Sequence, residues 1–210
     1  MRRAAAILLI ISALPLLAGD KKVTLGPLVK RDPQTAEIKD LQVPKPKQAC
    51  PNWAWAAVVQ LMLEKQNVTD YPQTYWVLKS AAGELCIESP IDLNQLKHWV
   101  EGDYILSDSS HVHFGGIVTP GAPQDVAHLV ALLREGHPVM VIWQGRACVL
   151  KSIEYDEYIY PNNQRMFEAR KLVLVDPLAK DPVLIDKTKD DLSQFGGVFE
   201  LKVGPIDHFR

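Results

Sequence analysis

The sequence is poor in cysteine, carries no dominant charge, and has no apolar stretch long enough to cross a membrane comfortably. Three cysteines among 210 residues allow at most one intramolecular disulfide, which excludes a scaffold held by several bridges. A formal net charge of −2 gives no electrostatic reason to expect nucleic acid as a partner. Internal repeats and low-complexity runs are also missing from the sequence. With 47% apolar residues, the chain suits one domain with a substantial core.

Residues 1–19 have the pattern of an export signal. Arg2 and Arg3 form a basic start, and the apolar segment Ala4–Ala18 that follows is too short for a transmembrane helix. Asp20 stands where a bacterial lipoprotein would carry cysteine. We therefore predict a secreted or periplasmic protein with no membrane anchor after signal removal.

Two further regions follow the signal. Residues 20–45 are rich in charge and proline, which predicts an extended lead-in contributing at most one strand. Residues 46–205 are predicted to form the folded domain.

The segment Trp53–Leu63 is the most apolar part of this domain. Only Gln60 interrupts it, so a helix here would be apolar around most of its circumference and would lie inside the core. Asn52 can cap its start, where free backbone N–H groups and the positive end of the helix dipole favour negative charge.

The remaining pattern predicts helices first and antiparallel strands afterwards, an α+β fold. Residues 107–123, with two Gly and Pro clusters, are expected to form an irregular lid or binding loop. Helices are expected at residues 73–82, 92–100, 124–135 and 187–195, and strands at 138–143, 148–160, 171–176 and 197–203.

Gln48 lies six residues before Ala54, which leads into Trp55-Ala56-Ala57. This segment resembles the active-site helix of papain-like cysteine peptidases, and most closely that of the bacterial peptidase C39-like group. In that family the glutamine supplies an oxyanion-hole donor, and the residue before Trp-Ala is the nucleophilic cysteine. The resemblance continues over residues 43–177 and implies a papain-like fold, with a buried central helix followed by an antiparallel sheet.

The same resemblance assigns two more positions. Gly145-Arg146-Ala147 stands where the family has the catalytic histidine, and Asp176 stands where it has the residue that orients that histidine. Ala54 cannot act as a nucleophile, and the guanidinium of Arg146 cannot accept a proton at physiological pH. Two independent losses indicate natural decay of the site rather than a single substitution made to trap a complex.

We therefore expect a catalytically inactive pseudopeptidase, without cofactor or metal, that binds a peptide or protein partner. Arg146 and Asp176 are expected to form an ion pair beside Ala54. The resemblance also implies a disulfide between Cys50 and Cys86, and the alternative is three free buried thiols.

Two other functions stay open at this point. An active cysteine peptidase or transferase could use a displaced thiol, from Cys50 or Cys148. A metal-dependent hydrolase could be built on His111 and His113, although no Cys, Asp or Glu stands near them at ligand spacing.

Overall fold

The computed structural model describes residues 30–47, 51–80 and 91–206. These residues form an α+β structure with four α-helices and an eight-stranded antiparallel sheet. The elements in chain order are β1 (Lys30–Glu37), α1 (Pro51–Glu64), α2 (Gln73–Lys79), α3 (Leu93–Val100), β2 (Gly102–Ile105), β3 (His111–Pro120), α4 (Val126–Glu135), β4 (Met140–Trp143), β5 (Arg146–Ile159), β6 (Arg165–Val175), β7 (Val183–Asp186), a 3-10 turn (Leu192–Gln194) and β8 (Phe195–Pro205).

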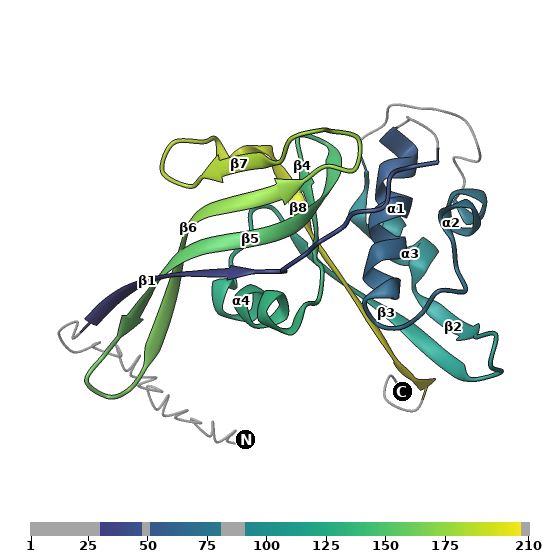
Figure 1. The fold of residues 1–210 in the computed structure, drawn as a ribbon, viewed down its shortest axis with the longest axis horizontal. Helices are drawn as coiled ribbons and strands as arrows, with labels where there is room; N and C mark the ends of the chain where they lie inside the picture. Colours follow the sequence, from purple (N-terminus) through teal and green to yellow (C-terminus); the bar gives the residue numbers. More distant parts are fainter. Residues whose placement is uncertain (1–29, 48–50, 81–90, 207–210) are drawn as a thin grey trace, which may run out of the picture.

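The sheet opens into two arms that diverge from the short strand β4 (Figure 1). Its strand order is β2-β3-β8-β4-β5-β6-β7. The eighth strand, β1, pairs with β5 beyond the point where β4 ends. One arm thus contains β8, β3 and β2, and the other contains β5, β6, β7 and β1.

Two hydrophobic cores lie on opposite sides of β4. Met140 and Ile142 belong to the first core, and Val141 and Trp143 belong to the second. We call the first the α1 core; it includes Trp53, Trp55, Val58, Val59, Met62, Trp76, Leu96, Phe114, Ala147, Val149, Phe199 and Leu201. We call the second the α4 core; it includes Ala36, Ile38, Val126, Leu129, Val130, Leu133, Cys148, Leu150, Ile153 and Tyr155.

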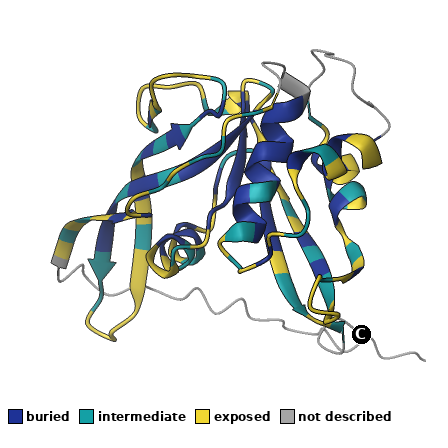
Figure 2. Ribbon diagram, turned by 45° about the vertical axis from the view of Figure 1, so that its right-hand side comes forward, coloured by how far each residue is buried: buried dark blue, intermediate teal, exposed yellow. Residues whose placement is uncertain are grey.

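The central helix expected from Trp53–Leu63 is confirmed as α1. Ala56, Ala57 and Val58 are completely buried. Figure 2 shows α1 as a dark blue column between the two arms. Burying this helix on most sides explains why its sequence lacks the polar stripe of a surface helix.

Local capping fixes the ends of the other main helices. The Asp92 side chain accepts hydrogen bonds from Asn94 N and Gln95 N at the start of α3, and Asp125 caps α4 through His128 N. Gly136 ends α4 with a φ of 79°, a conformation that glycine adopts without steric cost. Both helices were predicted, and both are confirmed.

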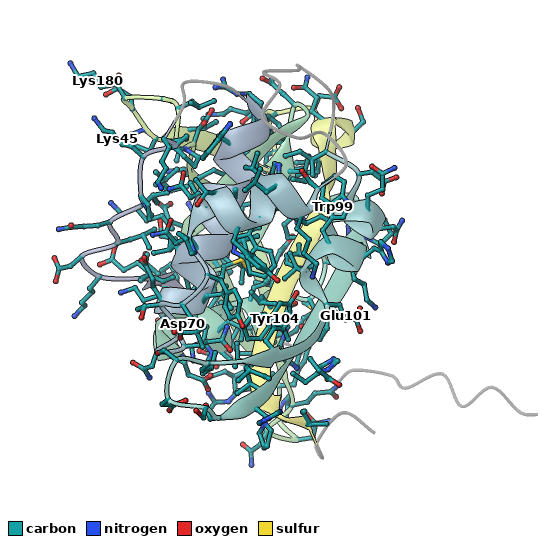
Figure 3. All side chains as sticks on the ribbon, turned by 90° about the vertical axis from the view of Figure 1, so that its right-hand side faces the viewer. Lys45, Asp70, Trp99, Glu101, Tyr104 and Lys180 are labelled. Atoms are coloured by element: carbon teal, nitrogen blue, oxygen red, sulfur yellow. The ribbon has the colours of Figure 1, made fainter. Side chains whose placement is uncertain are left out.

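Aromatic side chains fill the end of the α1 core near α2 and β2. The ring of Tyr104 stacks on Phe114 with 4.2 Å between centroids, and Tyr71 meets both rings edge-on. Figure 3 views the molecule from this side, with Tyr104 labelled beside the helices. Nearby, Trp99 of α3 packs on Trp55 of α1 at 5.4 Å. The contact between Trp99 and Trp55 attaches α3 to the central helix.

The prediction of an irregular loop at residues 107–123 is wrong. Residues His111–Pro120 form β3, which pairs with β8 from Val112 to Pro120. Gly116 does not interrupt this strand because its missing side chain makes room for a neighbour. A Cβ atom there would lie 2.8 Å from the ring of Phe199.

The prediction of a helix at residues 187–195 is also wrong. Within this range the helical part is a 3-10 turn at Leu192–Gln194. Aspartates hydrogen-bond the nearby backbone instead: Asp186 accepts from Thr188 N, and Asp191 accepts from Ser193 N. Such local bonds compete with those of a helix. The preceding strand β7 was not predicted.

The lead-in contributes one strand, as expected. β1 lies within residues 20–45 and pairs with Ser152–Ile159 of β5. No helix in the described parts of the chain is long and apolar enough to span a membrane.

Candidate functional site

The first turn of α1 holds one of the predicted site positions. Ala54 lies there and is buried, with 2% of its surface exposed. Beside it, Trp53 Nε1 is also buried and has no hydrogen-bond partner among the described residues. Gln48 and Cys50 precede the helix and lie outside the described residues, as does Cys86. The predicted disulfide and oxyanion donor therefore stay predictions.

The predicted ion pair between Arg146 and Asp176 is confirmed. Arg146 Nη2 lies 2.8 Å from Asp176 Oδ2. The Asp176 side chain is 3% exposed, whereas that of Arg146 is 49% exposed. Asp176 Oδ1 also accepts a hydrogen bond from Leu178 N at 2.8 Å. The carboxylate thus has partners on both oxygens, and half of the arginine side chain faces solvent.

The thiol of Cys148 lies deep beside this ion pair. Burial raises its pKa to about 12, the charge of Asp176 adds to the rise, and the charge of Arg146 opposes it. Only 1% of Cys148 is exposed. Because the thiolate is the reactive form of cysteine, this residue is a poor nucleophile at neutral pH.

The alternation of β5 determines which way these side chains point. Ala147 and Val149 pack in the α1 core, whereas Cys148 and Leu150 pack in the α4 core. Arg146 precedes Cys148 by two residues and so leaves the strand on the α4 side. The first turn of α1 and the β4–β5 hairpin lie at the same end of the molecule (Figure 1). The expected closeness of the ion pair to Ala54 stays a prediction.

The two histidines considered for a metal site lie on β3. His113 Nδ1 is 2.6 Å from Asp103 Oδ1 on the neighbouring strand β2, and His111 lies opposite Ile105. Within residues 30–47, 51–80 and 91–206, no three His, Cys, Asp or Glu side chains gather in a way that could hold a metal ion. The structure brings no acidic cluster to this histidine pair.

Sequence reasoning missed a second charged site. His128 Nε2 of α4 lies 2.8 Å from Glu200 Oε2 of β8, and the Glu200 side chain is only 10% exposed. A signal was present in the sequence, because Glu200 interrupts the apolar strand segment from Val198 to Leu201. A charge in such a position needs a partner or a ligand.

When compared with models of known protein families and with curated protein sequences, the chain matches none. The case for a function therefore depends on the residues and their geometry.

Proposed function

We propose that this protein is an exported, catalytically inactive protein of papain-like fold that binds a peptide or protein partner. The observation that carries the proposal is the ion pair of Arg146 with the buried Asp176. The resemblance puts a general base at position 146, and a guanidinium held by a carboxylate cannot serve as one.

The other reacting group is missing as well. Ala54, at the nucleophile position, offers a buried methyl group and no thiol. The described cysteine, Cys148, does not replace it, since its thiol is buried and its pKa is raised to about 12. Both features favour a binding function over cysteine catalysis.

The binding role depends on the exposed part of Arg146. Asp176 engages Nη2, and 49% of the arginine side chain stays accessible to solvent. Its remaining N–H groups can donate to a carboxylate, such as the C-terminus or an acidic side chain of a peptide. Asp176 fixes the direction of the guanidinium, which lowers the entropy lost when such a partner binds.

The test uses the mature protein and a random peptide library, with separate assays for cleavage and retention. We expect no cleavage product, no labelling of Cys148 by a thiol-directed epoxide, and retention of acidic peptides. Arg146→Gln should abolish retention. Arg170→Gln is the matched control, because Arg170 is also half-exposed, 47%, and lies 3.6 Å from a buried aspartate, Asp156.

Each result has a distinct meaning. Cleavage of peptides, or stoichiometric labelling of one native cysteine, would establish the alternative of an active enzyme with a displaced thiol. Equal retention by wild type and Arg146→Gln would remove Arg146 from the binding site. The double variant Ala54→Cys with Arg146→His should react with the epoxide; a folded variant that fails to react would show that the site is wrongly aligned.

A further inference from the structure

A pocket of about 410 Å³ lies between α4 and the C-terminal part of β8. Arg146 and Asp176 are not among the residues that line it. It exists because β8 continues beyond β4. The last pair between these strands is Met140 with Phe199, so the β8 residues from Glu200 onward have no strand beside them on that edge. The volume falls within the range of small-molecule sites.

Gln66 closes the backbone edge that β8 would otherwise expose here. Its Nε2 donates to Leu201 O at 2.9 Å, and its Oε1 accepts from Val203 N at 2.9 Å. The side-chain amide thus takes the place of a neighbouring strand. Because these backbone groups already have partners, the pocket is better suited to a compact ligand than to an added peptide strand.

The walls of the pocket are apolar, with charged groups at defined places. Glu200 and Glu135 contribute two carboxylates, and Lys202 contributes one ammonium. These two acids and one base give the lining a formal charge of −1 from carboxylates and ammonium. The apolar wall is formed by Leu132, Pro138, Val139, Leu201 and Val203.

Glu200 is the most buried of these charged groups. Its side chain is nine-tenths buried, and Oε2 is held by His128 Nε2 at 2.8 Å. Oε1 has no hydrogen-bond partner among residues 30–47, 51–80 and 91–206. A carboxylate oxygen without a protein partner, on a side chain that is largely buried at the wall of a pocket, is available as an acceptor for a ligand.

We propose that this pocket binds an organic monocation, an alkylammonium or alkylguanidinium group, with the charged end on Glu200 and the alkyl chain against the apolar wall. One positive charge complements the lining, and the chain covers surface that water would otherwise wet. His128 orients the carboxylate by holding its other oxygen. The proposal does not depend on the peptidase-like site.

The test is titration of the ¹⁵N-labelled mature protein with n-pentylammonium, n-pentanol and hexanoate, followed by amide NMR. We expect saturable shifts at Leu132, Val139 and Leu201 with the ammonium, and at least about tenfold weaker binding of the alcohol and the carboxylate. Glu200→Gln should weaken ammonium binding about tenfold or more, whereas Glu168→Gln, an exposed acid on β6, should leave it unchanged.

Equal binding of the ammonium and the alcohol would overturn the proposal, as would shifts that map outside the pocket or a folded Glu200→Gln variant with wild-type affinity. Should Glu200→Gln fail to fold, the three probes on the wild-type protein decide the question alone. Absence of saturable binding by n-pentylammonium would also refute the site.

Discussion

The ion pair of Arg146 with Asp176 makes a sharp prediction about stability. The Asp176 side chain is 3% exposed, and replacing Arg146 by alanine removes the charged donor that lies 2.8 Å from its Oδ2. Of the described partners, the carboxylate then keeps Leu178 N. Hydrogen bonds to charged groups contribute about 1.5–3 kcal/mol. Since half of the arginine side chain already contacts water, we expect a loss of about 2 kcal/mol, near the lower end of that range.

The assay is a double-mutant cycle of Arg146→Ala and Asp176→Asn, measured by urea unfolding. A loss of about 2 kcal/mol corresponds to a fall in Tm of about 4–8 °C for a domain of this size. The two substitutions should be non-additive by about 1 kcal/mol, because each removes the same interaction.

An exposed pair serves as the control. Lys171 Nζ lies 3.2 Å from Glu154 Oε2, and the two side chains are 34% and 40% exposed. Lys171→Ala should cost less than about 1 kcal/mol, because water solvates both partners. Additivity of Arg146→Ala and Asp176→Asn within about 0.3 kcal/mol would refute the reasoning, since the two charges would then be energetically independent.

Two further predictions concern other parts of the fold. Gly197→Ala should destabilise the protein by about 2–4 kcal/mol in urea unfolding, because φ is +150° and the added Cβ would lie 2.6 Å from Leu93 Cδ1. Gly121→Ala is the control: φ is +75° there, and the added Cβ would have nothing within 4 Å, so the substitution should cost only about 1 kcal/mol. Equal losses would contradict the steric argument. The hydrogen bond from Arg31 lowers the pKa of the buried Asp156 in the folded protein. The ionised Asp156 therefore stabilises the fold at pH values above its pKa in the unfolded chain, and this stabilisation disappears as the pH falls through its pKa in the folded protein. Arg31→Ala should therefore move acid unfolding, followed by circular dichroism, to higher pH, and an unchanged midpoint would count against this ion pair.

The sequence predicted those elements whose signals are local. The all-apolar run at Trp53–Leu63 was sufficient for α1, and Asp92 and Gly136 marked true helix ends. The Arg146–Asp176 pair was predicted through the family resemblance and is present. The strands β5 and β6 were also predicted, but both begin earlier in the structure than the sequence indicated.

Long-range packing explains the failures. Gly115 and Gly116 suggested a loop, but the space required by Phe199 makes a glycine suitable inside a strand. No neighbouring residue in the sequence reveals that requirement. Likewise, His128 and Glu200 are 72 residues apart, so nothing in either segment indicated that they meet.

The position of β1 has a consequence for how the chain folds. Arg31 meets Asp156, 125 residues later, across the pairing of β1 with β5. During synthesis, β1 leaves the ribosome long before its partner strand β5 exists. Contacts of such high sequence separation slow folding, because a large loop must close first. Pro33 within β1 helps during this interval, since a strand with proline is a poor template for pairing with other chains. Completion of the arm that contains β1 and β5 is therefore expected to be a late event. Partly synthesised chains should expose the edge of β5 that β1 later covers.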